Sequence, residues 1–294
     1  MKNMPNIPEE KHLFLEIITE QLSQIQGMVA VVLGGSYASG RQHANSDLDI
    51  GLYYHEAQPF AINNIRTVAE KIAKPDIPAT VTDFYTWGAW VNGGAWIHTP
   101  VGKVDFLYRN LDQVEKTIAD CHQGIVKHDY DQQPSHGYYS SGYLAETQIC
   151  IPLYDPQKQI ERLKTQVAIY PSLMKQRIIS DSLWAAEFTL LHARGFAATG
   201  DIYNTAGCLV RAAANLTQVL FAINEAYFLS DKKVMGIIAA FSILPAGYAE
   251  EIGSILAHPG QTTAELHNAV FRMEAAWQSV TALTQGSYLP KFLL

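Results

Sequence analysis

The chain has little cysteine, few charged residues and no long hydrophobic run. Only Cys121, Cys150 and Cys208 are cysteines, an odd and widely spaced set, so a fold stapled by disulfides is excluded and reduced thiols are expected. The longest uncharged apolar run, 234–249, is interrupted by Pro245 and is short for a bilayer span. The N-terminal residues lack the apolar stretch of a signal peptide. We therefore expect a cytoplasmic protein without membrane association.

Hydrophobic residues make up 48% of the 294 residues and charged residues only 17%. This much apolar surface excludes a disordered chain and predicts a substantial core. The 28 acidic residues outnumber the 21 basic ones, for a formal net charge of −7. A negative field disfavours polyanions, so nucleic acid is a disfavoured partner.

The hydrophobic pattern changes near the middle of the chain. Up to about residue 125, short strand-like runs alternate with helical ones, whereas beyond Pro156 the spacing is that of helices alone. The sequence therefore predicts an α/β (α+β) domain over residues 1–135, a transition over 136–156 and an all-α helical bundle over 157–294.

The elements expected in each part have approximate bounds. In the first domain we expect helices at 9–25, 61–73 and 111–125 and strands at 29–33, 47–54 and 104–107. In the second we expect four to six helices, near 157–169, 171–198, 202–228, 231–241, 245–256 and 262–284. On the first helix, the apolar face is expected to carry Leu13, Ile17 and Leu22.

The most informative stretch is VVLGGSYASGRQHANSDLDIG, residues 31–51. A buried strand runs into Gly35 and Ser36, and Asp47 and Asp49 follow eleven and thirteen residues after the serine. Gly35 lets the backbone approach a ligand, and a helix starting at Ser36 would offer amide groups and a hydroxyl to a phosphate. The pattern predicts a phosphate site next to two carboxylates.

Successive side chains of a strand alternate between faces, so Asp47 and Asp49 point the same way. Asp105 lies in another apolar strand and completes a triad if the two strands are neighbours. A divalent cation relieves the repulsion between such carboxylates, and oxygen ligands suit Mg²⁺ or Mn²⁺ with triphosphate oxygens. The alternative is structural: Asp47 would pair with Arg41, and Asp105 with Lys103 or Arg109. Because Asp is depleted in strands, three acids together favour the metal site.

With Gly35-Ser36, Asp47-Leu48-Asp49 and the later Asp105, the chain resembles the nucleotidyltransferase superfamily that includes DNA polymerase beta and kanamycin nucleotidyltransferase. The resemblance implies a mixed β-sheet in the first domain. It also implies that Gly35 and Ser36 hold the triphosphate and that Asp47 and Asp49 bind two Mg²⁺ ions.

The same resemblance implies that Asp105 binds one of these ions and helps to activate the acceptor. Relatives often carry an arginine shortly after the motif serine, where this chain has Tyr37 and Ser39. Charge for the phosphates is therefore expected from Arg41 or Arg109. Ser46 completes the expected nucleotide-binding set.

The implied reaction is transfer of a nucleoside monophosphate from an NTP to an acceptor hydroxyl, with release of pyrophosphate. ATP is the expected NTP. We expect a small-molecule acceptor such as an aminoglycoside-like compound, and a homodimer is compatible with the sequence. Two alternatives stay open: a toxin-type enzyme that modifies tRNA or a protein, and a non-catalytic nucleotide sensor. Trp87, Trp90 and Trp96 would either stack a nucleobase or pack in the core, and Glu187 is a distant candidate for the acceptor base.

Overall fold

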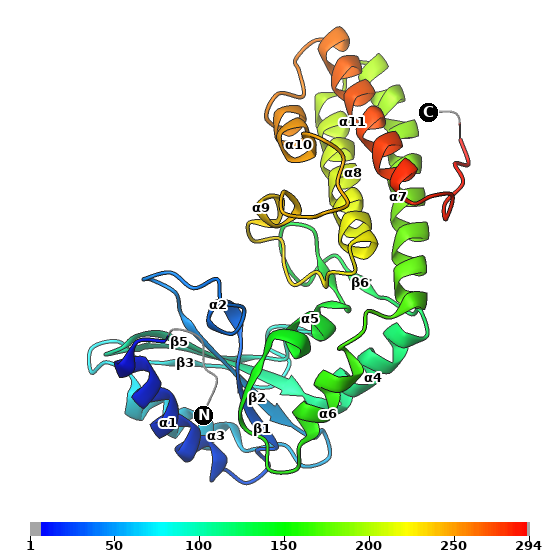
Figure 1. Ribbon diagram of the computed structural model, residues 1–294. Coiled ribbons are helices and arrows are strands. Elements are labelled where there is room, and N and C mark those ends of the chain that lie inside the picture. The colour runs from blue at the N-terminus through cyan, green and yellow to red at the C-terminus, as the bar shows by residue number, and fades with distance from the viewer. Residues whose placement is uncertain (1–6, 293–294) are drawn as a thin grey trace. The chain divides into compact units, whose positions relative to one another are not determined.

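The structure, a computed structural model, describes residues 7–292 and divides into two compact units (Figure 1). Of these residues, the first unit comprises 7–119 together with 128–132 and 138–169. The second comprises 120–127, 133–137 and 170–292. The first unit therefore takes in residues that the sequence analysis placed in the transition and at the start of the bundle.

The first unit is built on a six-stranded sheet with the order β3-β4-β5-β2-β1-β8. Strands β2 and β5 are parallel, and the other neighbouring pairs are antiparallel. The sheet is therefore mixed, and the predicted fold class is confirmed. The strands are β1 (Ala30–Leu33), β2 (Leu48–Tyr54), β3 (Thr80–Val81), β4 (Gly94–Thr99), β5 (Gly102–Asn110) and β8 (Ile151–Tyr154).

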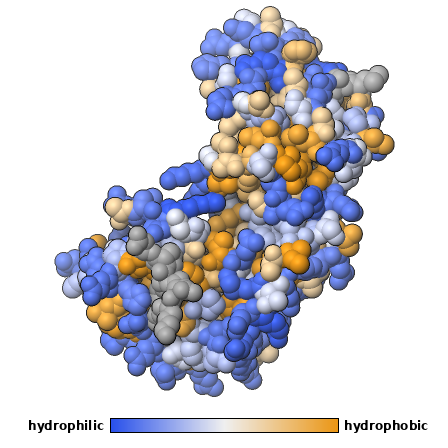
Figure 2. Space-filling view, viewed as in Figure 1, coloured by the Kyte–Doolittle hydropathy of each residue, from blue (hydrophilic) through white to orange (hydrophobic). Residues whose placement is uncertain are grey.

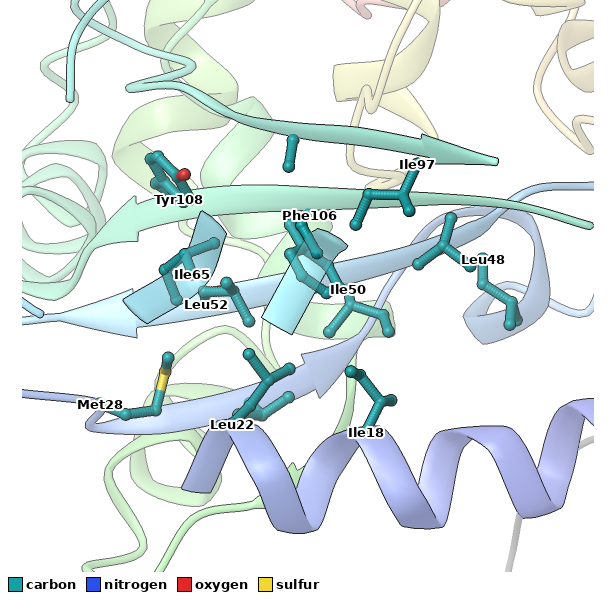
Figure 3. Close-up of a cluster of buried hydrophobic side chains, with 14 of the residues drawn as sticks. Ile18, Leu22, Met28, Leu48, Ile50, Leu52, Ile65, Ile97, Phe106 and Tyr108 are labelled. Atoms are coloured by element: carbon teal, nitrogen blue, oxygen red, sulfur yellow. The ribbon is translucent and has the colours of Figure 1, made fainter. Parts of the chain in front are cut away.

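Helices flank this sheet, and two of them build the main core. They are α1 (Glu9–Ser23), α2 (Gly35–Ala38), α3 (Ile62–Ile72), α4 (Leu111–His122), α5 (Gly142–Ile149) and α6 (Gln159–Gln166). Helices α1 and α3 lie on the same side of the sheet (Figure 1). Figure 3 shows Ile18 and Leu22 of α1 pointing toward Ile50 and Leu52 of β2. The removal of this apolar surface from water stabilises the unit.

The buried face of α1 differs from the predicted one. Leu13 and Ile17 are exposed, at 57% and 48%, whereas Leu15 and Ile18 are fully buried. Leu22 is buried as expected. This helix has two rows of apolar side chains at helical spacing. The row with Leu15, Ile18 and Leu22 packs against the sheet, and Lys11 is buried together with it.

Strands β4 and β5 show which face of the sheet is covered. Ala95 and Ile97 in β4 are buried, whereas Trp96 and His98, which alternate with them, are exposed. In β5 the side chains at 104, 106 and 108 are buried, while those at 103, 105 and 107 are half-buried. The alternation follows from the two-residue period of a strand. The second face is thus more open at this end of the sheet, and the predicted acids lie on it.

Strand β8 was not predicted from the sequence. It pairs antiparallel with β1, with Leu33 opposite Ile151, and so forms one edge of the sheet. Pro152 within it is compatible with an edge position, because proline lacks the N–H that a central strand needs. Helix α5, immediately before this strand, was not predicted either.

The second unit contains α7 (Ser172–Ala198), α8 (Ile202–Ile223), α9 (Val234–Ile238), α10 (Tyr248–Ala257) and α11 (Thr263–Leu283). Arg194 on α7 and Glu274 on α11 form a bidentate ion pair, with N–O distances of 2.6 and 3.0 Å. The indole N–H of Trp277 donates to the carbonyl of Leu183 at 3.2 Å. The helical character predicted for this part of the chain is confirmed.

Helix α8 is long and apolar enough to cross a membrane by length and composition. In the structure, 61% of its most apolar window is buried within the protein. The core helix of a globular unit has the same composition and the same burial. Figure 2 shows apolar side chains gathered over this helix on one face of the second unit.

Candidate active site

Three side chains form a row across three neighbouring strands of the open face. Asp49 in β2 and Asp105 in β5 are direct register partners, and Trp96 in β4 is the partner of Asp105 on its other side. Register partners on one face have Cβ atoms about 5 Å apart. The condition set for the triad, that the strand of Asp105 lies next to the strand of Asp49, is therefore met by the strand register.

The glycine loop after β1 lies directly against Asp49. The amide of Gly34 donates to the carbonyl oxygen of Asp49 at 2.8 Å. A Cβ atom on Gly35 would lie 1.8 Å from Oδ2 of Asp49, and Gly35 has a φ of +59°. Both the space and the backbone conformation therefore require glycine at position 35.

The helix expected to begin at Ser36 is a single turn, α2, that starts at Gly35. A single turn supplies few aligned peptide dipoles, so its attraction for an anion is smaller than that of a longer helix. Ser36 itself is half-buried. Its role at the triphosphate stays a prediction.

Lys103 joins two of the predicted acids. Its ammonium lies 3.0 Å from Oδ2 of Asp47 and 3.1 Å from Oδ2 of Asp105. Partial burial alone would lower the pKa of Lys103, but the hydrogen bonds to Asp47 and Asp105 outweigh it, so that the pKa is raised. The salt bridge weighed as the structural alternative for Asp105 is therefore present, and Asp47 pairs with Lys103 rather than with Arg41.

This donor set fits a divalent cation in chemistry and charge. Three carboxylates, Asp47, Asp49 and Asp105, less the one ammonium of Lys103 leave a formal charge of −2, which one Mg²⁺ would neutralise. Within residues 7–292, however, no three His, Cys, Asp or Glu side chains are gathered closely enough to form a ready metal site. The metal ligands, and the number of ions, stay a prediction.

Ser46 and Arg41 lie in the loop between the glycine turn and β2. Ser46 is buried, and its hydroxyl accepts a hydrogen bond from the amide of His43 at 2.9 Å. Its carbonyl accepts one from Nζ of Lys11 at 3.1 Å. Arg41 is exposed. The structure therefore gives Ser46 a loop-forming contact and leaves the side chain of Arg41 in solvent.

Lys11 is a residue of this site that the sequence analysis missed. Its buried ammonium donates to the hydroxyl of Tyr37 in α2 at 2.8 Å, as well as to the carbonyl of Ser46. One side chain of α1 thus fastens both ends of the loop that carries Arg41. The sequence signal was weak, because a lysine that follows two glutamates in the first turn of a helix is typical of an exposed position.

Arg109 lies on the same face as Asp105, four residues further along β5, which is about 13 Å. Its guanidinium forms a bidentate ion pair with Glu146 of α5, with N–O distances of 2.7 and 2.8 Å. Burial acts to lower the pKa of Arg109, but Glu146 outweighs it and holds the pKa above its usual range. Since this charge is engaged with Glu146, we leave Arg109 out of the proposed nucleotide site.

Glu187 belongs to the second unit and is fully buried there. Its carboxylate accepts hydrogen bonds from the hydroxyl of Tyr288 and from the amides of Lys291 and Phe292. The carboxylate thus anchors the C-terminal segment to α7. We therefore leave Glu187 out of the proposed chemistry.

The comparisons with known proteins agree with the motif. Residues 15–85, which include Gly35, Ser36, Asp47 and Asp49, match the family model of the nucleotidyltransferase domain. This match confirms the family predicted from the sequence for that part of the chain, and with it the class of enzyme. No curated protein matches the chain significantly.

Two solved structures are similar over most of the chain. One is a nucleotidyltransferase-like protein from Exiguobacterium sibiricum 255-15, with 10% identity and a TM-score of 0.48, covering 95% of this chain and 78% of its own. The other is an aminoglycoside 6-adenyltransferase from Bacillus subtilis, with 12% identity and a TM-score of 0.36, covering 96% and 93%. Similarities this distant say nothing about the substrate of this chain.

Proposed function

We propose that this protein transfers a nucleoside monophosphate from an NTP to a hydroxyl group of a small molecule, and that the NTP is ATP. The nucleotidyltransferase domain in residues 15–85 supports this proposal. In this reaction the acceptor oxygen bonds to the α-phosphorus, and the bond from that phosphorus to the bridging oxygen of the β-phosphate breaks. Pyrophosphate leaves with the electron pair of that bond. The reaction needs no oxidant or further co-reactant.

The observation that carries the proposal is the row of Asp49 and Asp105 beside the glycine loop. The absence of a side chain at Gly35 lets the carboxylate of Asp49 lie directly against the glycine loop, because a Cβ atom at this position would collide with Oδ2 of Asp49. Asp105 is then one strand further along the row. We place the triphosphate at Gly35 and Ser36 and the acceptor hydroxyl at Asp105.

A divalent cation, when bound by Asp47, Asp49 and Asp105, would neutralise phosphate charge and favour loss of the hydroxyl proton. Of the protein's own groups, Asp105 accepts the proton of the attacking hydroxyl. Lys103 neutralises part of the negative charge of the acids, and Lys11 holds the loop next to them. Arg41 is exposed and available to the phosphates.

A small acceptor is favoured over a polymer by the charge of the chain. A tRNA acceptor would need a basic groove next to Asp105. Its neighbours on the open face include Asp49, Trp96 and Lys103, and Lys103 is already paired with acids. The formal net charge of −7 also opposes a polyanion.

We keep the cytoplasm as the proposed location of the protein. None of the three cysteines forms a disulfide within residues 7–292, and reduced thiols are the usual state in the cytoplasm.

The test combines binding with turnover. Thermal unfolding is measured with Mg²⁺ and each of the four NTPs, and pyrophosphate release is measured with ATP, Mg²⁺ and a panel of hydroxylated compounds. Because a ligand of the folded state stabilises by about 2.7 kcal/mol at a hundredfold excess over Kd, binding is expected to raise Tm clearly. A shift without pyrophosphate release would favour the nucleotide sensor, and the absence of any shift would reject the phosphate site.

A further inference from the structure

Two tryptophans stand next to the acids on the open face of the sheet. Trp96 is the register partner of Asp105 and keeps 45% of its surface exposed. Trp87 stacks on it, with ring centroids 4.5 Å apart and an interplanar angle of 21°. Tryptophan is highly buried on average, so a stacked pair with an open indole at this position favours a ligand-binding role.

The pair is held in place by the surrounding backbone. The ring of Trp87 lies over Gly94, where a Cβ atom would be 2.8 Å from its Cζ3 atom. The side-chain amide of Gln132 donates to the carbonyl of Trp87, and its oxygen accepts from the amide of Trp90 at 3.1 Å. The indoles are therefore a fixed surface, which reduces the entropy lost when a ligand binds to it.

The order of the strands decides which substrate meets this surface. Across the sheet, the glycine loop after β1 comes first, followed by Asp49, Asp105 and then Trp96. In phosphoryl-type transfer the attacking and leaving oxygens are roughly in line through the phosphorus. If the leaving pyrophosphate lies at the glycine loop, the attacking oxygen comes from the opposite side, where Trp96 stands.

We propose that Trp87 and Trp96 form the acceptor subsite and that the acceptor carries its hydroxyl on a ring that stacks on the indole of Trp96. The proposal rests on the nucleotidyl transfer proposed above. The stacked ring presents its hydroxyl to Asp105, the oxygen bonds to the α-phosphorus as pyrophosphate leaves, and the hydroxyl proton passes to Asp105 or to water.

The shared chemistry of the acceptor is a ring face with a hydroxyl at its edge. Two sources supply it: the C–H face of a sugar or cyclitol, and the π face of an aromatic alcohol or nucleoside. A linear polyol has the hydroxyl groups but no ring face. It is therefore the matched negative probe.

The experiment uses the full chain with labelled ATP and Mg²⁺. Glucosamine, inositol and cytidine serve as ring acceptors, and sorbitol serves as the linear control. Trp96→Ala and Trp96→Phe are compared with Trp184→Ala. Trp184 is also 45% exposed and stacked on an aromatic side chain, Phe188, but it lies on α7 of the second unit.

We expect at least one ring compound to be labelled faster than sorbitol. Trp96→Ala should then lower kcat/KM for that compound by about tenfold or more, because stacking on an aromatic side chain contributes on this scale. Trp96→Phe should stay within about threefold of the wild type, since a phenyl ring keeps a stacking face. The affinity for Mg²⁺-ATP should be the same in all three variants, and Trp184→Ala should behave as the wild type.

Three results would overturn the proposal. Labelling of the ring compounds no faster than sorbitol would reject the acceptor class. An unchanged kcat/KM in Trp96→Ala would reject the subsite, and a weakened affinity for Mg²⁺-ATP in this variant would assign the pair to the nucleobase. Failure of the proposed function gives a different result, because the wild type itself would then not bind Mg²⁺-ATP or release pyrophosphate.

Discussion

Asp49 and Asp105 are direct partners across the parallel strands β2 and β5, so two carboxylates stand side by side on one face of the sheet. Like charges at this spacing repel each other, and the repulsion raises the free energy of the metal-free protein. A structural role and a ligand-binding role of these acids therefore have opposite consequences for stability.

The first prediction concerns Asp49→Asn. The variant keeps the shape of the side chain and removes one negative charge. We expect the free energy of unfolding without metal to be unchanged or higher by up to about 1 kcal/mol, and activity to fall at least about a hundredfold. Thermal melts in EDTA and in Mg²⁺, together with pyrophosphate release, check both effects. A metal-free variant that melts well below the wild type and keeps its activity would mean that Asp49 is a salt-bridge partner only.

The second prediction compares Gly35→Ala with Gly40→Ala. Both glycines have positive φ, +59° and +69°. Nothing lies within 4 Å of a Cβ at Gly40, whereas a Cβ at Gly35 meets Asp49 at 1.8 Å. Gly40→Ala should therefore cost only the backbone strain of about 1–2 kcal/mol and keep its activity. Gly35→Ala should cost more and lose activity, which urea unfolding and turnover measure. Equal losses in the two variants would contradict the close approach to Asp49.

The third prediction concerns the buried ammonium of Lys11. Lys11→Met keeps the length of the side chain and removes the donor to Tyr37 and Ser46. An acceptor left without its donor costs about 1–3 kcal/mol when buried, so we expect a loss of stability in this range and a higher KM for the NTP. Lys71→Met, at an exposed position of α3, is the control and should change neither value. An unchanged KM would show that the loop keeps its conformation without this lysine.

The fourth prediction concerns the Arg109–Glu146 pair. Removal of one partner of a buried pair leaves an uncompensated charge, at a cost of about 3–5 kcal/mol. The Glu146 side chain is 30% exposed, and solvent screening reduces that cost, so for Glu146→Ala we expect about 2–3 kcal/mol. The exposed pair of Arg162 and Glu115 is the control. Exposed ion pairs contribute about 0–1 kcal/mol, so Glu115→Ala should cost about 1 kcal/mol at most. Urea unfolding of both variants checks the difference, and equal costs would contradict it.

The fifth prediction concerns the start of α11. Thr262 caps the helix by accepting from the amide of Glu265, and the Glu265 side chain accepts from the amide of Thr262. Thr262→Ala should cost about 1 kcal/mol. Hydrogen bonds from the amides of Gln261 and Thr262 lower the pKa of Glu265.

A lowered pKa in the folded state sets the sign of the pH dependence. The stabilisation by Glu265 is fully present above the pKa of the unfolded chain, about 4.3, and is lost as the pH falls through the lower pKa of the folded state. Glu265→Gln should therefore remove part of the loss of stability below about pH 4.3. Melting curves between pH 2 and 7 check this, with Glu20→Gln on an exposed turn of α1 as the control. Identical pH profiles of Glu265→Gln and the wild type would contradict it.

Local patterns carried most of what could be predicted from the sequence. The strand, glycine turn and Asp-x-Asp strand follow one another in the chain, so their identity and order are readable without knowledge of the fold. That Asp105 lies on the same face of the sheet as Asp49 follows from the two-residue period of a strand, provided that β5 lies next to β2. That neighbourhood came from the resemblance to the family rather than from the residues of β5.

Contacts between distant segments were beyond the reach of the sequence. Leu15 and Leu13 on α1 are equally apolar, and only the sheet decides which of them is buried. The pairing of Lys103 with two acids depends on how the Asp47 segment meets β5, and the ion pair of Arg109 depends on α5, a helix that was not predicted. The sequence analysis expected Arg109 to bind a phosphate. In the structure, its guanidinium forms an ion pair with Glu146 instead.

The pairing of β8 with β1 also affects the order in which the protein is able to fold during synthesis. Until residue 154 has left the ribosome, the apolar strand Ala30–Leu33 has no neighbour on one side. A nascent chain, or a fragment cut at residue 135, would expose that edge to other chains, and exposed apolar edges promote aggregation. A fragment that ends after residue 169 would include the missing strand. The domain that carries the catalytic motif therefore depends on a segment made more than a hundred residues after that motif.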